Sequence, residues 1–326
     1  MRRFSRFYIL LLPLALLFSQ EPVNEEFRAT WVITWNAYSG NLSTEQLKAR
    51  TRQILDNHKK ANMNAVLWQV RQAGTSYYNS PFEPWGYYLG YKDPGYDPLE
   101  YAIQEAHKRG IEIHAWFNAF HTSSSRPGTP AAEHPEWVCR DADGNPMPDN
   151  YCLSPGLETV REYTRDVAMD IVNRYDIDGL HFDYIRWNEY SSKTVSLGSE
   201  EPFDGNFSPE IIEGMAKGSR YLYDIEHPYS GGVPDSLPGV PYSSWESYWR
   251  HSLDLFMEMF HDSVQAVKPW VRVSVAALGR YKKWSGYYSV YQDAAKWFNE
   301  GWVDQLTPMH YHWTTGDGFV TALTTD

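Results

Sequence analysis

Strand-like and helix-like segments alternate along the chain, and this alternation constrains the fold more than any other feature. Six short segments are apolar and rich in β-branched and aromatic residues, which is typical of strands. They span residues 27–34, 64–70, 111–120, 178–187, 271–278 and 304–313. Apolar residues at helical spacing, or helix boundary signals, predict helices over residues 44–62, 98–109, 156–175, 244–268 and 290–300, with a shorter one over 209–223. Such alternation produces right-handed βαβ units and a parallel sheet.

Polar and aromatic side chains gather at the C-terminal ends of the predicted strands, where α/β barrels and open α/β sheets both carry their sites. An open nucleotide-binding sheet is disfavoured, because no strand is followed by a glycine-rich phosphate loop. A (β/α)8 TIM barrel of about 250 residues fits the chain of 326 residues as one domain. Six strands are visible and the chain ends 13 residues after residue 313, so we expect a barrel truncated after its sixth strand.

The N-terminus has the features of a secretory signal peptide. Three arginines precede the apolar run Phe7–Phe18, which is too short to favour a membrane-spanning helix. We therefore expect residues 1–20 to be removed. Residues 21–326 would then form an exported domain, periplasmic or extracellular, with no membrane contact after cleavage. A retained membrane anchor is the alternative.

The only two cysteines, Cys139 and Cys152, lie in the loop-like segment 122–153. In an exported protein they are expected to form one disulfide that closes this loop, and two thiols are the alternative. Two cysteines alone do not make a zinc site.

The charge and the aromatic content narrow the class of ligand. Without the three N-terminal arginines the chain has 26 basic against 41 acidic residues, a net charge of about −15. This excess of negative charge argues against nucleic acid and anionic membranes as partners. The aromatic fraction is 16%, with 14 Trp and 24 Tyr, which favours a surface that stacks on flat, partly apolar ligands such as sugar rings.

The segment DGLHFDYIRW (178–187) is apolar like a buried strand, yet it carries His181 and Asp183 two residues apart. Side chains two apart on a strand face the same side, so one face presents an imidazole and a carboxylate. We expect Gly179 to leave room inside the barrel and His181 to lie one layer below the mouth. Asp183 would then emerge at the mouth beside Arg186.

Several motifs follow one another in order along the chain. They are RATWV in the first strand, QVR followed by SYYNSPFEPW, then GYDPLEYAIQEAHKRGIEIHAWFN, HPEW, LSPGLETVREY, YDIDGLHFDYIRW and the WR pair before VRVSVAAL. As a set, over roughly residues 27–313, they resemble bacterial glycosyl-hydrolase-like family ten, a family of exported (β/α)8-barrel glycoside hydrolases. Two features depart from this family: Tyr184 stands where many relatives carry a second Asp, and the last two barrel units are not visible.

The resemblance implies a glycosidase that acts on a polysaccharide or peptidoglycan-type glycan and needs no cofactor. Cleavage of a glycosidic bond usually takes two carboxyl groups. Asp183 is the first candidate, and the alternative is a structural carboxylate paired with Arg71 or Arg186. Glu189 and Asp317 lead for the second carboxyl, because they lie just beyond strand ends; the alternative is that they are solvated loop charges.

The candidate substrate-binding residues lie at or near predicted strand ends: Trp35, Gln69, Arg71, Trp116, Asn118, Arg186, Trp187, Tyr311, His312 and Trp313. Gln69 and Arg71 are expected to share one face of their strand. Arg71 would then either hold a sugar or fix Asp183. For each aromatic residue, core packing is the alternative to stacking on a sugar.

Two other functions remain open. A barrel that kept its aromatic residues but lost its second carboxyl would bind glycans without cleaving them. A metal-dependent hydrolase would instead activate a metal-bound water, and its ligands would come from His114, His181, Asp183, His310 and His312. The main interpretation includes no metal.

Overall fold

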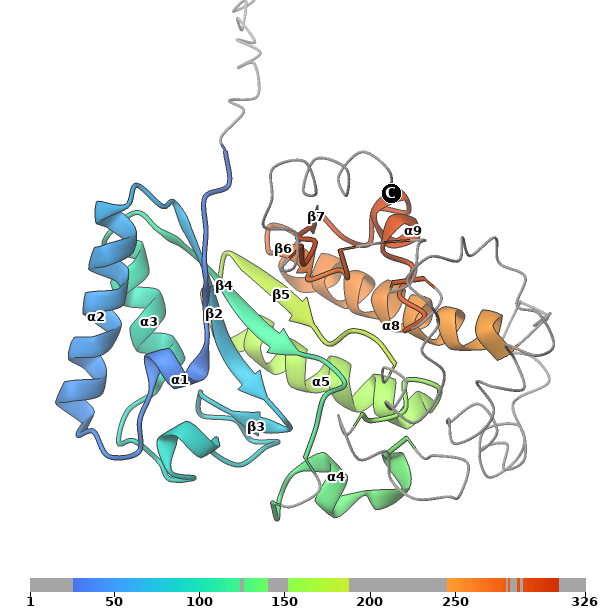
Figure 1. Ribbon diagram of the computed structural model, residues 1–326, viewed down its shortest axis with the longest axis horizontal. Coiled ribbons are helices and arrows are strands. Elements are labelled where there is room, and N and C mark those ends of the chain that lie inside the picture. Colours follow the sequence, from blue (N-terminus) through green and yellow to red (C-terminus); the bar gives the residue numbers. More distant parts are fainter. Residues whose placement is uncertain are drawn as a thin grey trace, which may run out of the picture.

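The computed structural model describes residues 26–123, 126–139, 152–187, 245–279, 281, 286–287 and 290–310, with only the backbone described for 245–248. Its centre is a sheet of seven strands (Figure 1). The strands are β1 (Trp31–Val32), β2 (Ala65–Gln72), β3 (Thr75–Ser76), β4 (Glu112–Asn118), β5 (Gly179–Asp183), β6 (Arg272–Val275) and β7 (Gln305–Leu306). All six predicted strands are present, and β3 is a short addition.

The strand order is β1-β2-β4-β5-β6-β7, and every neighbouring pair in it is parallel. Only β3 is antiparallel, where it pairs with the end of β2. Each crossover therefore adds its strand on the same side of the previous one. A doubly wound sheet would reverse direction at a switch point, whereas a barrel advances in one direction. The predicted barrel topology is confirmed for the described strands.

The helices follow the strands in the expected alternation. They are α1 (Thr34–Ala37), α2 (Thr44–Lys60), α3 (Pro98–His107), α4 (Pro130–Glu133), α5 (Glu158–Arg174), α8 (Trp245–Val267) and α9 (Ala294–Asn299), with 3₁₀ turns η1 (Tyr87–Leu89) and η2 (Pro135–Trp137). In Figure 1, α2 and α3 lie side by side next to β2, and α5 and α8 run together beyond β5. The short helix predicted over 209–223 lies outside the described residues.

Local sequence signals explain where two of these helices begin. The Ser43 side chain accepts a hydrogen bond from the backbone of Gln46, and the Gln46 side chain accepts one from the backbone of Ser43. This reciprocal capping box satisfies two amide groups at the start of α2. At the start of α3, the Asp97 carboxylate accepts from Leu99 N and Glu100 N, and Pro98 occupies the first turn.

The sheet separates two different layers. On the helix side, aromatic rings pack edge to face: the Phe182 centroid lies 5.7 Å from that of Phe117, 5.4 Å from Phe256 and 4.7 Å from Phe260. On the other side, buried polar residues line the inner face, namely Gln69, His114, Asn118, His181, Asp183 and Ser274. The helices therefore cover an ordinary apolar core, while the polar side chains that could bind or react with a ligand face the inside of the barrel.

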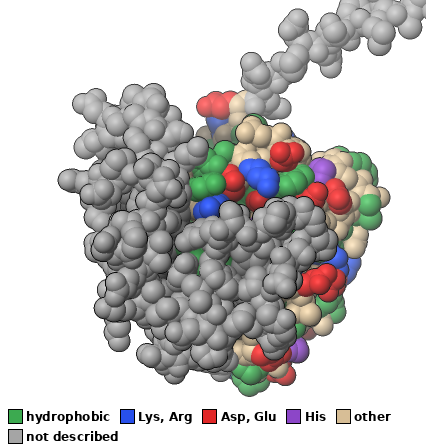
Figure 2. All heavy atoms as spheres, turned by 90° about the vertical axis from the view of Figure 1, so that its right-hand side faces the viewer, with side chains coloured by type: hydrophobic (Ala, Val, Ile, Leu, Met, Phe, Trp, Pro, Cys, Tyr) green, Lys and Arg blue, Asp and Glu red, His purple; other side chains and the backbone are tan. Residues whose placement is uncertain are grey.

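The described surface facing the viewer in Figure 2 mixes acidic, basic and apolar side chains. Among the described residues, no helix combines the length and the apolar character needed to cross a bilayer. The predicted signal peptide, residues 1–20, lies outside the described part of the chain.

Candidate active site

Three predicted site residues meet at the C-terminal ends of β2, β4 and β5. Asn118 and Asp183 are directly paired in the parallel register of β4 and β5. Gln69 Nε2 donates to Asn118 Oδ1 at 3.4 Å, and Gln69 Oε1 accepts from the backbone N–H of Thr34 at 3.0 Å. The amide groups thus connect the end of β1 to the end of β4, where Asn118 pairs with Asp183 of β5. Gln69, Asn118 and Asp183 therefore lie together at one end of the sheet, and their roles in catalysis or substrate binding stay predictions.

Asp183 occupies a nearly enclosed position, with 7% of its surface exposed. Burial raises the pKa of its carboxyl above the ordinary value, although the nearby Arg186 charge, the Tyr184 backbone N–H and the Trp116 indole act in the opposite direction. The Tyr184 N–H donates to Asp183 Oδ1 at 2.7 Å. Carboxyls with raised pKa values in a site are suited to donating protons.

The backbone turns sharply directly after Asp183. Tyr184 has a φ of +52°, in the left-handed region that costs a non-glycine residue about 1–2 kcal/mol. This conformation places the Tyr184 N–H against the Asp183 carboxylate. Backbone strain of this kind is concentrated at functional sites, where the surrounding structure maintains it.

Trp116 lies on β4 two residues before Asn118, on the same face of the sheet, and it pairs with His181 of β5. It is almost fully buried, and its indole N–H, which lies near the Asp183 carboxyl and favours its ionised form, has no acceptor within hydrogen-bonding distance in the described structure. A buried donor without a partner is costly unless something else, such as a ligand hydroxyl or a water, accepts from it. That Trp116 contacts substrate stays a prediction.

His181 is held as a neutral structural residue inside the barrel. Trp31 Nε1–H donates to its Nε2 at 3.0 Å, so the ring proton lies on Nδ1, which donates to Ser274 Oγ at 2.8 Å. Burial, with a smaller contribution from His114, lowers the pKa of His181 to about 3. Both ring nitrogens are therefore occupied, and neither is available to a metal.

Of the other histidines in the metal hypothesis, His114 and His310 are described, and neither is a hydrogen-bond partner of the His181 ring nitrogens. His114 packs beside Gly179, where an added Cβ would lie 2.3 Å from His114 Nδ1. This confirms that Gly179 leaves room inside the barrel. Within the described ranges, no group of three or more His, Cys, Asp or Glu side chains is arranged to hold a metal ion. His312 lies outside those ranges.

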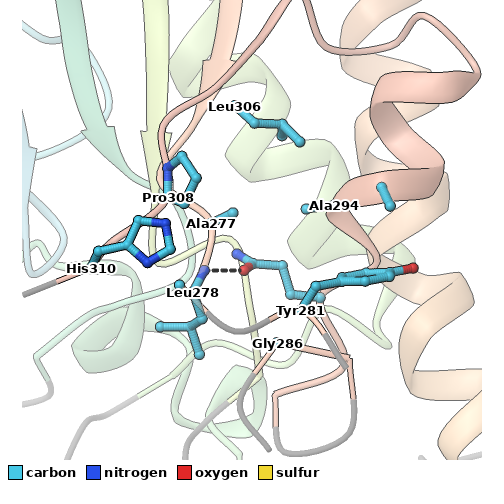
Figure 3. Close-up of a pocket in the computed structure, with 11 residues that line it drawn as sticks. Ala277, Leu278, Tyr281, Gly286, Ala294, Leu306, Pro308 and His310 are labelled. Atoms are coloured by element: carbon cyan, nitrogen blue, oxygen red, sulfur yellow. Dashed lines mark hydrogen bonds between the residues drawn. The ribbon is translucent and has the colours of Figure 1, made fainter. Parts of the chain in front are cut away.

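His310 lines a separate pocket at the C-terminal ends of β6 and β7 (Figure 3). The pocket has a volume of about 250 Å³, and its wall includes Leu278, Leu306 and Pro308. Gln292 closes one side: its Oε1 accepts from Leu278 N at 2.8 Å, and its Nε2 donates to Ile185 O at 3.2 Å. Through Ile185 the pocket borders the chain that leaves β5, at the same end of the sheet as Asp183.

The prediction that Gln69 and Arg71 share a face is wrong. A β-bulge shifts the register between them, so that Gln69 pairs with Trp116 but Arg71 pairs with Phe117. Trp116 and Phe117 are consecutive and face opposite sides, so the bulge turns Arg71 to the helix side of the sheet. The guanidinium lies 4.8 Å from the Phe117 ring centroid.

Arg71 is instead half of a buried ion pair. Its Nη2 lies 2.6 Å from Glu83 Oε1, and neither side chain has any exposed surface. Its Nη1 donates to the backbone carbonyls of Asn118 and Ala119, and Tyr163 Oη donates to Glu83 Oε1 at 3.1 Å. Neither role predicted for Arg71 is observed, because it contacts neither the surface nor Asp183. It anchors the loop after β3 to the end of β4.

The described aromatic residues that were predicted to stack on sugars lie in different environments. Trp187 is completely buried, and its Nε1–H donates to Trp249 O at 2.9 Å, so it is a core residue and not a sugar platform. Trp35 is 49% exposed. Arg186 is partly exposed, with its guanidinium 4.6 Å from the Tyr184 ring centroid, beside the carboxyl it influences.

The predicted disulfide is not formed. Cys139 and Cys152 face each other across an antiparallel pair of segments, and Cys139 N donates to Cys152 O at 2.8 Å. The predicted proximity is therefore correct. However, the Cys152 thiol lies against carbonyl oxygens, 3.1 Å from that of Leu153 and 3.6 Å from that of Arg186, instead of bonding to the opposite sulfur.

Comparison with known proteins identifies the family. The family model described as glycosyl hydrolase-like 10 matches residues 26–322. The chain belongs to this family. It is 28% identical over 321 residues to "Glycosyl hydrolase YngK" of Bacillus subtilis, and 25% identical over 329 residues to "Glycosyl hydrolase DigH" of Escherichia coli K12. These alignments cover 90% and 88% of this chain but 55% and 66% of the two relatives, so the chain spans only part of their length.

Two solved structures support the barrel fold of this family member at low sequence identity. An α-L-fucosidase from Paenibacillus thiaminolyticus superposes with a TM-score of 0.50 at 14% identity, covering 78% of this chain and 33% of that one. An α-galactosidase from Lactobacillus brevis also gives 0.50, at 12% identity, covering 91% and 31%. The family and these folds together identify a glycoside-hydrolase-like TIM barrel.

One residue of the mouth was not anticipated from the sequence of this family member. His121 follows β4 by three residues, and its ring centroid lies 4.7 Å from that of Tyr184. Burial, followed by the charges of Arg71 and Arg186, lowers the pKa of His121 to about 4. The sequence signal that could have identified His121 is its position directly after a predicted strand that ends at residue 120. The other predicted site residues lie outside the described chain, namely Glu189, Tyr311, His312, Trp313 and Asp317.

Proposed function

We propose that this chain is an exported glycoside hydrolase that cleaves an extracellular or cell-wall polysaccharide, of which a peptidoglycan-type glycan is one candidate. The observation that carries the proposal is the position of Asp183: a buried carboxyl with a raised pKa at the C-terminal end of a barrel strand. This is the end at which TIM-barrel enzymes carry out their chemistry. Membership of the glycosyl hydrolase-like 10 family supports the reaction class.

In this proposal Asp183 acts as the general acid. A carboxyl with a raised pKa keeps its proton to higher pH and can transfer it to the glycosidic oxygen as the bond to the sugar breaks. The second carboxyl then attacks the sugar or removes a proton from the attacking water. Glu189 and Asp317 are the candidates for that group. The products are a new reducing end and a free hydroxyl on the leaving sugar.

Neighbouring groups would bind and orient the sugar at Asp183. The Trp116 N–H, which lies near Asp183 and has no acceptor within hydrogen-bonding distance, offers a donor to a sugar hydroxyl. Asn118 and Gln69 are already linked to each other and to Thr34, so their amides are fixed before a ligand arrives. Arg186 favours the ionised form of Asp183 that remains after proton transfer. No cofactor takes part in this chemistry.

The test is the release of new reducing ends from defined glycans. Wild-type protein is incubated with purified peptidoglycan and with neutral polysaccharides, and the soluble products are quantified by a reducing-sugar assay and by mass spectrometry. The proposal predicts products that each contain one added water per cleaved bond. Binding to a glycan without any release would contradict it, and would favour a glycan-binding barrel.

A further inference from the structure

A group of four aromatic rings, two exposed and two partly exposed, lies beside the mouth of the barrel. It consists of Trp35, from α1 after β1, and Tyr87, Tyr88 and Tyr91, from the loop after β3; we call it the aromatic surface. Trp35 is 49% exposed and Tyr87 is 64% exposed. Large side chains of this kind are seldom left in water in a group, and such groups commonly mark a binding surface.

The rings contact one another in a continuous series. The ring centroids of Trp35 and Tyr88 are 6.0 Å apart, those of Tyr88 and Tyr87 are 5.1 Å apart, and those of Tyr87 and Tyr91 are 5.8 Å apart. The interplanar angles are 57°, 87° and 74°, so the rings meet by their edges instead of covering one another's faces. The ring faces of Trp35 and Tyr87 therefore remain available to a ligand, whereas the Arg126 guanidinium lies over the Tyr91 ring, 3.8 Å from its centroid.

The backbone under the aromatic surface is fixed. Gly86 packs so tightly on Tyr77 that an added Cβ would lie 2.2 Å from the Tyr77 ring, and an added Cβ at Gly40 would lie 2.9 Å from Gly90 N. On the other side, Thr34 N, at the start of α1, donates to Gln69 Oε1. A surface that is ordered in advance loses little conformational entropy when it binds.

The aromatic surface lies at the same end of the sheet as Asp183. Trp35 follows β1, and Gln69 and Asn118 connect that turn by hydrogen bonds to the strand end paired with Asp183. Three strand spacings separate β1 from β5, which is roughly 14 Å along the sheet. This separation matches a short oligosaccharide that extends from the cleaved bond.

We propose that the aromatic surface is a distal glycan-binding site, which holds pyranose rings of the polysaccharide away from the bond that Asp183 cleaves. The choice of ligand rests on the proposed function. The apolar C–H faces of a sugar would stack on Trp35 and Tyr87, and the tyrosine hydroxyls would bond its hydroxyl groups. The negative charge of the chain disfavours an anionic ligand here.

The test measures binding separately from cleavage. All variants are made in an Asp183→Asn background, and binding is followed by affinity electrophoresis in gels containing hydroxyethyl cellulose or glycol chitin. Trp35→Ala and Tyr87→Ala are expected to weaken binding about three- to tenfold each. Trp270→Ala is the matched control, because Trp270 is 68% exposed but precedes β6, at the opposite end of the strands. It is expected to bind like the parent protein.

Conservative variants separate loss of stacking from loss of fold. Trp35→Phe and Tyr87→Phe keep an aromatic face and should recover most of the binding. The proposal is overturned if the parent protein binds neither polymer, if Trp35→Ala and Tyr87→Ala bind as the parent does, or if Trp270→Ala weakens binding equally. If the wild-type chain releases no reducing ends while binding by the Asp183→Asn parent still depends on Trp35, the proposed hydrolysis alone is contradicted and the distal site stays supported.

Discussion

The Arg71 guanidinium and the Glu83 carboxylate form an ion pair from which water is completely excluded, with Nη2 2.6 Å from Oε1. The pair joins the end of β2 to the loop that follows β3, and Tyr163 of α5 adds a third hydrogen-bonding group. Arg71 also donates to the backbone carbonyls of Asn118 and Ala119, so the pair holds the end of β4 in place from the helix side of the sheet.

Removing one member of the pair should destabilise the protein strongly. Glu83→Gln leaves the Arg71 charge buried without its counter-charge, and we expect the free energy of unfolding to fall by about 3–5 kcal/mol. Urea denaturation at pH 7 measures this change. The control is Glu26→Gln, which breaks an exposed pair with Arg28 and should leave the denaturation midpoint unchanged. Equal effects of the two substitutions would contradict the structural role given to Glu83.

The sequence predicts most of the architecture, because strands and helices have local signals. The six parallel strands, the Ser43 and Pro98 helix starts and the space at Gly179 all follow from residue type and spacing. The environment of Arg71 could not be predicted in the same way. A single bulge between Gln69 and Arg71 reverses the side of the sheet that the guanidinium faces, and the position of that bulge depends on pairing with β4.

Trp187 and the cysteines show a second limit of sequence reasoning. Trp187 directly follows the mouth segment, yet it points into the core and bonds to Trp249, which is 62 residues away in the chain. Cys139 and Cys152 are close, as predicted, but their bonding depends on side-chain directions. Candidate residues can be selected by their position near a strand end. Whether they face the ligand depends on tertiary contacts that a single sequence does not specify.

His181 should make stability depend on pH below neutrality. Its pKa is about 3 in the folded protein against an ordinary 6.5, so below pH 6.5 the unfolded chain binds a proton that the folded chain does not. The contribution of neutral His181 to the free energy of unfolding is therefore complete above pH 6.5. It is lost as the pH falls from 6.5 towards 3, and the free energy of unfolding then decreases by up to about 1.4 kcal/mol per pH unit.

The measurement is urea denaturation at several pH values between 4.5 and 7, roughly the range in which an ordinary histidine titrates. His181→Asn removes the titrating group, so its free energy of unfolding should fall less steeply with acidification than that of the wild type. His121, whose pKa is about 4, remains in the variant and leaves a residual slope of the same sign. Parallel pH dependences in the two proteins would show that His181 is not a buried neutral residue.

Gly179 should tolerate no side chain. A Cβ there would lie 2.3 Å from His114 Nδ1 and 2.8 Å from Arg272 O, so Gly179→Ala should lower the free energy of unfolding by about 1–3 kcal/mol through overpacking. Thermal denaturation measures the loss. His114→Ala in the same chain should relieve part of it, because the closer of the two clashes disappears. A Gly179→Ala protein as stable as the wild type would refute the close approach of β4 and β5 at this position.

The most direct measurement compares glycan cleavage by Asp183→Asn with that of the wild type. The substitution keeps the size of the side chain but removes the proton that it transfers, and we expect kcat to fall by about 10²- to 10⁴-fold. The control is Asp254→Asn, a comparably buried carboxylate that contacts Lys296 and Trp297 between α8 and α9. This control should keep its activity per folded molecule. Cleavage by Asp183→Asn within twofold of the wild-type rate would contradict the assignment of Asp183 as the catalytic acid.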